Sequence, residues 1–197
     1  MYSQSVPASC PGSSAALLLV DVIHDLEFPG GEQLFGSAKA MAERTADLKR
    51  RVRRRGIPAI YLNEEDSRFR PSFSRQLKRC LCEPVRGRPI AQLLRPEEED
   101  FFVLRSQQPA GLMARLDAML QSFQAGTLIF AGMAASLCLL FTANDTYLSD
   151  FRLLVPRDCV AAKTEADREN ALEQISYVLD IDTRPSDELA PLLELIS

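Results

Sequence analysis

Five short apolar runs, separated by longer segments with a helical pattern, constrain the fold of this 197-residue chain more than any other feature. The runs are rich in Leu, Val, Ile and Phe, which is typical of strands that are buried on both faces of a parallel sheet. They cover residues 15–20, 57–62, 101–104, 127–131 and 152–155. The helical patterns cover residues 38–55, 112–123, 136–148 and 165–179. This alternation predicts a doubly wound (Rossmann-like), mostly parallel sheet with helices on both faces, in three α/β/α layers.

The length and composition favour one domain. The chain is 46% hydrophobic, and a domain of this size buries roughly 70% of the surface that its unfolded form exposes. We expect a single domain over residues 15–197, preceded by a flexible N-terminal segment over residues 1–14. Four prolines between residues 63 and 100 predict a long excursion with short helices. Residues 185–197 are expected to form a small terminal helix.

The cysteines and the apolar segments favour a cytoplasmic protein without a membrane span. Five cysteines form an odd set, and no secretory signal precedes them, so we expect a reducing compartment. The longest apolar run, residues 127–143, is interrupted by Gly132 and Ser136, and we interpret it as a strand followed by a buried helix. A net charge of -4 argues against a nucleic-acid-binding domain.

One segment is nevertheless strongly basic. Residues 49–55 read Lys-Arg-Arg-Val-Arg-Arg-Arg and close the first predicted helix. Cations at a helix C-terminus suit the helix dipole, so a solvated helix end is the simpler interpretation. A patch for an anion or a partner is the alternative.

Cys138 is the strongest candidate for chemistry. Residues 127–138 read as a strand, a loop of small residues and the start of a helix, and a helix N-terminus favours a thiolate and a developing oxyanion. Ligands bind beyond the carboxyl ends of parallel strands. If the first, third and fourth runs are neighbours, Asp21, Arg105 and Cys138 therefore meet in one cleft. They would supply a base, a charge stabiliser and a nucleophile.

A plainer interpretation of the same three residues stays open. Asp21 would cap a helix, Arg105 would be a surface ion-pair partner, and Cys138 would be one of the many small buried cysteines of protein cores.

The order of these residues resembles the isochorismatase-like cysteine hydrolases, a family that includes nicotinamidases and N-carbamoyl amidohydrolases. The resemblance runs from about residue 15 to residue 179. It rests on Leu-Val-Asp-Val-Ile-His-Asp at 19–25, Gly-Met-Ala-Ala-Ser-Leu-Cys at 132–138 and Thr-Ala-Asn-Asp-Thr-Tyr at 142–147. It implies a triad of aspartate, lysine and cysteine, a thioester on Cys138, and hydrolysis by water. It also implies a cis peptide between Met133 and Ala134 that aims N–H groups at the oxyanion.

Two departures from the family pattern bear on activity. Arg105 stands where the family has its catalytic lysine. Arginine keeps the positive charge, but its pKa above ~12 prevents proton exchange. Residues 106–111 replace an aromatic-bearing segment that ends in Ser-Ala-Phe, so the pocket wall is expected to differ.

The resemblance also narrows the range of expected metals, cofactors and substrates. Nicotinamidases bind a metal through aspartate and histidines after the second strand, whereas residues 63–69 contain no histidine. We therefore expect neither a metal nor another cofactor, and nicotinamide is disfavoured as the substrate. Isochorismate is disfavoured too, because members that act on it lack the cysteine. His24 is expected to be hydrogen-bonded near the cleft, and Phe28 and Phe69 are either pocket aromatics or ordinary core or surface residues.

The first hypothesis is thus a metal-independent hydrolase of a small amide, carbamoyl or lactam C–N bond. The alternative is a catalytically degenerate member that binds a small molecule or a protein partner without turnover. A redox role for Cys138 is a weaker third hypothesis, because no resolving cysteine is near it in sequence. Homo-oligomers are common in the family, so a dimer or tetramer is expected. No nucleic-acid or membrane partner is expected.

Overall fold

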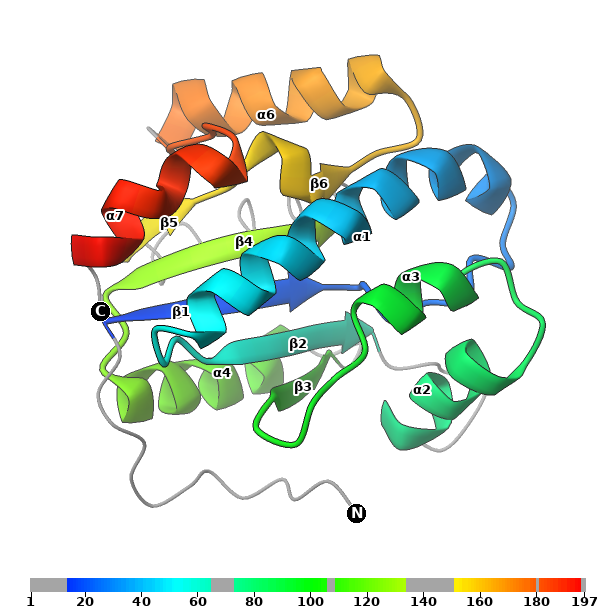
Figure 1. Ribbon diagram of the computed structural model, residues 1–197, viewed down its shortest axis with the longest axis horizontal. Helices are drawn as coiled ribbons and strands as arrows, with labels where there is room; N and C mark the ends of the chain where they lie inside the picture. Colours follow the sequence, from blue (N-terminus) through cyan, green and yellow to red (C-terminus); the bar gives the residue numbers. More distant parts are fainter. Residues whose placement is uncertain (1–13, 65–72, 106–108, 134–150, 180, 196–197) are drawn as a thin grey trace.

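The strands form one parallel sheet at the centre of the molecule (Figure 1). A computed structural model of the protein describes residues 14–64, 73–105, 109–133, 151–179 and 181–195. In chain order the strands are β1 (Ala15–Val20), β2 (Ala59–Glu64), β3 (Phe101–Arg105), β4 (Thr127–Met133), β5 (Arg152–Leu154) and β6 (Val160–Ala161). The sheet has the order β3-β2-β1-β4-β5, and β6 pairs with the end of β4. Each of these pairings is parallel.

Helices cover both faces of this sheet (Figure 1). They are α1 (Gly31–Arg53), α2 (Phe73–Cys82), α3 (Arg88–Leu93), α4 (Pro109–Phe123), α6 (Glu165–Leu179) and α7 (Ala190–Leu195), with 3-10 turns η1 (Arg157–Cys159) and η2 (Ser186–Leu189). This architecture confirms the predicted three-layer α/β fold. None of the helices in the described part of the chain is long and apolar enough to cross a membrane.

The central strand β1 alternates its side chains between two hydrophobic cores, because successive residues of a strand point to opposite faces. Leu17 and Leu19 belong to the core that α1, α2, α3 and α7 cover. Leu18 and Val20 belong to the core that α4 and α6 cover. All six β1 residues are completely buried, which is why this run contains no polar residue.

The first helix begins earlier than predicted, at Gly31 instead of residue 38. Gly30 has a positive φ of 90° and precedes the helix. A Cβ on Gly31 would lie 2.1 Å from the carbonyl oxygen of Leu26, so only glycine fits this tight turn. Two adjacent glycines therefore mark a helix start here, although they resemble a loop signal in the sequence.

The other predicted elements differ little from the structure. β2 begins two residues later than predicted, after Pro58, and β6 was not predicted because it has only two residues. The excursion over residues 63–100 contains the short helices α2 and α3, and the terminal segment contains η2 and α7. The predicted helix over 136–148 and the N-terminal segment over 1–13 lie outside the described residues.

A buried ammonium group ties α1 to β2 and to the chain that leads into β3. Lys49 of α1 is 5% exposed, and its Nζ donates to Asp100 Oδ2 at 2.5 Å, to the Tyr61 hydroxyl at 3.0 Å and to the carbonyl of Arg95 at 3.3 Å. Burial raises the pKa of Tyr61, so its hydroxyl stays protonated and donates to the carbonyl of Leu94 at 2.9 Å. Lys49 is thus a structural residue.

Replacing Lys49 by Met keeps most of the apolar stem but leaves the Asp100 carboxylate buried without its cation. Removing one partner of a buried ion pair is strongly destabilising. We expect Lys49→Met to lower the free energy of unfolding by about 3 kcal/mol, measured by urea denaturation. Lys39→Met, at an exposed position of the same helix, is the matched control and should change it by less than about 0.5 kcal/mol. Equal free energies of unfolding for the two variants would show that the buried contacts of Lys49 do not stabilise the fold.

Candidate functional site

The carboxyl ends of the strands meet at one edge of the sheet, and their register determines which residues lie side by side. Val20 of β1 is level with Leu62 of β2 on one side and with Gly132 of β4 on the other. The first and fourth predicted strands are therefore neighbours. The third is not a neighbour of the first, because β2 lies between them. Two strand spacings, about 10 Å, separate the backbones of β1 and β3.

Asp21 follows β1 directly and has an unusual backbone. Its φ is 53°, in the left-handed region that non-glycine residues rarely adopt. Its N–H donates to the carbonyl of Leu62 at 2.8 Å, and the residue is only 7% exposed. Such strain is found preferentially at functional sites. Asp21 does not cap the next described helix, α1, because that helix begins only at Gly31.

On the other side of β1, Gly132 brings β4 close to Asp21. Its φ is 137°, and a Cβ there would lie 2.1 Å from the carbonyl oxygen of Val20. Any side chain would therefore push the two strands apart. Met133, the last residue of β4, is 7% exposed, and the chain continues from it into the predicted nucleophile loop.

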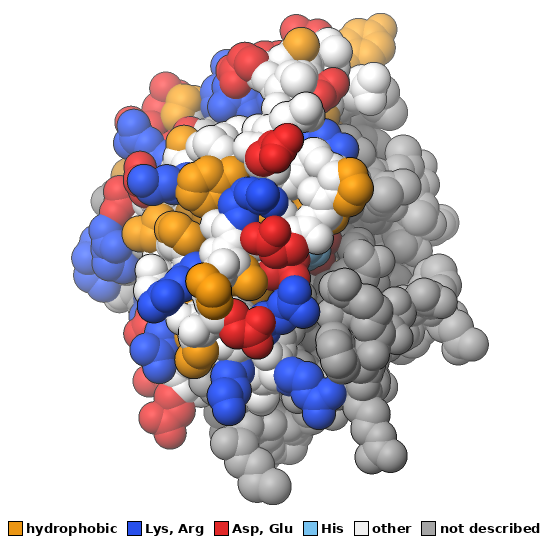
Figure 2. Space-filling view, turned by 90° about the vertical axis from the view of Figure 1, so that its right-hand side faces the viewer, with side chains coloured by type: hydrophobic (Ala, Val, Ile, Leu, Met, Phe, Trp, Pro, Cys, Tyr) orange, Lys and Arg blue, Asp and Glu red, His pale blue; other side chains and the backbone are white. Residues whose placement is uncertain are grey.

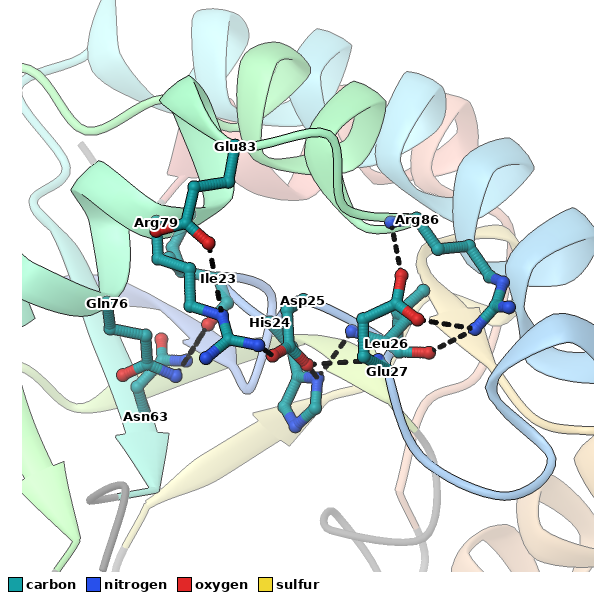
Figure 3. Close-up of polar contacts among 10 residues, drawn as sticks. All are labelled: Ile23, His24, Asp25, Leu26, Glu27, Asn63, Gln76, Arg79, Glu83 and Arg86. Carbon is teal, nitrogen blue, oxygen red and sulfur yellow. Dashed lines mark hydrogen bonds and ion pairs between the residues drawn. The ribbon is translucent and has the colours of Figure 1, made fainter. Parts of the chain in front are cut away.

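Two side-chain amides converge on the carbonyl oxygen of Ile23, in the loop after β1 (Figure 3). Asn63 Nδ2 donates to it at 2.9 Å and Gln76 Nε2 at 2.8 Å. This arrangement engages the side-chain nitrogen of Asn63 but not its side-chain oxygen. Asn63 is 1% exposed, and its Oδ1 accepts no hydrogen bond from the described residues. The site edge thus contains a buried acceptor.

Asp25 fixes the same loop to α2 (Figure 3). It is 9% exposed, its Oδ2 lies 2.9 Å from Arg79 Nη2, and its Oδ1 accepts the N–H of Glu27 at 3.0 Å. Leu26, at a positive φ of 58°, has its carbonyl held by Arg86 Nη1 at 2.6 Å. These contacts offset the strain of a loop that contains two left-handed residues.

His24 has one ring nitrogen occupied within this loop. Its Nδ1 accepts the N–H of Leu26 at 2.9 Å and lies 3.3 Å from Asp25 Oδ1. Nδ1 must lack a proton to accept the Leu26 N–H, but it must carry one to donate to Asp25. We favour the shorter contact, with Leu26, which places the proton of a neutral ring on Nε2. Phe28 packs edge-on against the ring, with centroids 5.4 Å apart, and also contacts the core under α1. His24 is thus hydrogen-bonded beside the strand ends.

The face of the molecule beside this edge carries mixed charge (Figure 2). Lys and Arg side chains are interspersed with Asp and Glu over α2 and α3. The described part of this face therefore presents no broad field of one sign. No group of three His, Cys, Asp or Glu side chains that could hold a metal occurs within the described residues.

The remaining predicted site residues are only partly placed. Arg105 ends β3, level with Glu64 of β2, but its side chain is not described. Ala134, Cys138 and Phe69 lie outside the described residues, as do the predicted cis peptide after Met133 and residues 106–108 of the altered segment. Sequence reasoning missed Gln76 and Arg79 as groups around the site. Their i, i+3 spacing on α2 was the only signal for them.

Two other cysteines provide a chemical contrast to Cys138. Burial raises the pKa of both the Cys80 and the Cys159 thiol to about 12. Since only a thiolate is a good nucleophile, both are inert at neutral pH. Cys82 is exposed.

Comparison with known proteins agrees with this geometry. The model of the isochorismatase domain matches residues 15–183. The uncharacterized isochorismatase family protein YaaI of Bacillus subtilis (strain 168) is 30% identical over 164 residues, which cover 83% of this chain and 90% of the relative. Among solved structures, a cysteine hydrolase from Pseudomonas syringae pv. phaseolicola aligns with a TM-score of 0.68 at 18% identity, over 100% of both chains. N-carbamoylsarcosine amidase from Thermoplasma acidophilum aligns with a TM-score of 0.57 at 22% identity, over 88% of this chain and 97% of that chain. The chain therefore belongs to the isochorismatase family.

Proposed function

We propose that this protein is a cysteine hydrolase that cleaves a C–N bond of a small amide, carbamoyl compound or lactam. Cys138 is the nucleophile, Asp21 the general base and acid, and Arg105 the electrostatic stabiliser. The observation that carries the proposal is the buried, left-handed Asp21, which lies between the ends of β2 and β4 and beside the strand that leads into the Cys138 loop.

The comparisons support this reaction class. One structural relative is a cysteine hydrolase, and another is an amidase that acts on N-carbamoylsarcosine. Both align over nearly the whole of this chain or all of it. The carboxylate after β1 and the glycine next to the last residue of β4 are features of the present structure that suit such chemistry.

The proposed reaction has two steps. Asp21 takes the thiol proton, the Cys138 sulfur bonds to the carbonyl carbon, and the proton passes to the nitrogen as the C–N bond breaks. A thioester remains on Cys138, and the amine leaves. Asp21 then takes a proton from water, which attacks the thioester, and returns that proton to the departing sulfur. Positive charge from Arg105 offsets the charge that develops on oxygen.

The reactivity of Cys138 tests whether this residue is the nucleophile. We expect alkylation by iodoacetamide, mapped by mass spectrometry against pH, to show a midpoint for Cys138 well below ~8.5. Exposed Cys82 should react with an ordinary midpoint, and Cys80 and Cys159 should stay unmodified at neutral pH because burial raises their pKa to about 12. Incubation with p-nitrophenyl acetate should acetylate Cys138 in the wild type. The Cys138→Ala variant should gain no acetyl group at that position. A Cys138 that reacts no faster than Cys82 would contradict the proposal.

Replacing Asp21 by Asn separates its two effects on Cys138. The negative charge of Asp21 opposes the thiolate, so its removal should lower the midpoint of Cys138 alkylation by on the order of one pH unit. Loss of the proton carrier should at the same time reduce turnover of a substrate amide by about 100-fold or more. The surface variant Asp117→Asn is the control and should change neither quantity. Slower turnover with unaltered alkylation would place Asp21 away from the thiol.

The second candidate function is binding of a small molecule or a partner without turnover, and Arg105 is the observation that favours it. Arg105→Lys tests it, because lysine can exchange protons and arginine cannot. If the site is a weakened enzyme, release of amine from a panel of amides and carbamoyl compounds should rise by about 10-fold or more. Arg105→Gln, which removes the charge, should instead slow Cys138 alkylation. No turnover in either the wild type or Arg105→Lys, with an ordinary Cys138 midpoint, would favour the binding function.

A further inference from the structure

The basic run at the end of α1 is divided between two sides of the helix. Lys49 and Arg53, four residues apart, both point toward the loop before β3. Lys49 binds Asp100 as described above, and Arg53 Nη2 donates to Glu99 Oε2 at 2.8 Å. The remaining arginines lie on another side. Because residues three, four and seven apart share one side of a helix, Arg44, Arg51 and Arg54 fall together there with Arg50.

These four arginines line a cavity of about 370 Å³ between the second half of α1 and η2. Asp47 and the η2 residues Ser186 and Asp187 complete its lining. The cavity is far from the candidate catalytic edge. α1 runs away from the carboxyl ends of the strands, and its last turns lie near their amino ends, beside α7 (Figure 1).

Two of the arginines are held in place by the protein. Arg51 donates to the carbonyl of Ser186 at 2.8 Å and to its Oγ at 3.1 Å. Ser186 is itself fixed, because its N–H donates to Asp158 Oδ1 at 2.7 Å and its hydroxyl to Asp158 Oδ2 at 2.8 Å. Arg50 pairs with Asp47. One side of the cavity is therefore pre-organised.

The other two arginines are not used by the fold. Arg44 and Arg54 are exposed, and within the described part of the chain neither guanidinium has a polar partner. The helix dipole explains cations in the last turn only, and Arg44 lies more than two turns before the end of α1. Four guanidinium groups around one hollow repel one another, and two carboxylates offset only half of their charge.

We propose that this cavity binds a phosphate monoester of a small molecule. Guanidinium groups bind phosphate oxygens through paired N–H donors, and several of them converge here. The volume is at the lower end of the range for small-molecule sites, so it admits an organic group besides the phosphate. Asp47 and Asp187 at its walls, and a net charge of -4 for the whole chain, oppose an extended polyanion such as nucleic acid.

Titration calorimetry on the full chain in chloride buffer tests this, with inorganic phosphate, glycerol phosphate and glycerol as separate titrants. We expect saturable binding of both phosphate compounds, tighter for glycerol phosphate, and none of glycerol. Equal affinity for phosphate and its ester would overturn the ester as the ligand. Absence of saturable binding of either, or loss of the signal when potassium chloride matches the ionic strength, would overturn the site itself.

Variants locate the binding. The double variant R44Q/R54Q should weaken glycerol phosphate binding by about 10-fold or more, and R44Q alone should weaken it measurably. R88Q/R95Q removes the same charge from two exposed arginines elsewhere and should leave the affinity unchanged. Thermal melts in chloride verify that each variant is folded. Equal weakening in both double variants would show that binding follows net charge and would overturn the proposal.

Discussion

The parallel pairing of β1 with β4 is the contact on which the rest of the site depends. It brings together two chain segments that are separated by more than a hundred residues, and it continues to the last residue of β1, where Val20 lies beside Gly132. Only glycine permits this approach, since a Cβ would lie 2.1 Å from the Val20 carbonyl oxygen. A shift of β4 by one residue would turn its core side chains to the wrong face. The hydrophobic cores on the two sides of β1 therefore also determine where Asp21 lies relative to the loop after β4.

The loop after β1 is held by residues that come from the excursion between β2 and β3. Gln76 and Arg79 of α2 bind the Ile23 carbonyl and the Asp25 carboxylate, and Arg86 binds the Leu26 carbonyl. Backbone strain at Asp21 and Leu26 is of order 1–3 kcal/mol for each residue. Charge-assisted contacts with partly buried arginines are of comparable size. The excursion is thus part of the machinery that holds Asp21 in a strained position.

The fold could be predicted from the sequence because strands that are buried on both faces appear there as continuous runs of apolar residues. Among the five predicted strands, β1 is the one that was predicted with its observed limits, and it is also the one without a polar residue. The position of Asp21 at the edge of the sheet could be predicted, because it directly follows such a run. The contacts of Asn63 with Ile23 and of Arg79 with Asp25 could not, because they span 40 and 54 positions in the chain and no local pattern encodes them. The start of α1 at Gly31 was not predicted for a related reason, since glycine indicates a tight backbone and not which element follows it.

Arginine at the end of β3 changes how the proposed reaction must distribute its protons. A lysine near a thiol and a carboxylate can share a proton with either group, whereas a guanidinium stays protonated throughout. Asp21 would then be the only side chain of the three that both takes and returns the proton. A carboxylate with this task must be protected from bulk water but must not be tied to a permanent cation. The other carboxylate of this loop, Asp25, has a structural task instead, because Arg79 and the Glu27 N–H bind it and thereby hold the loop.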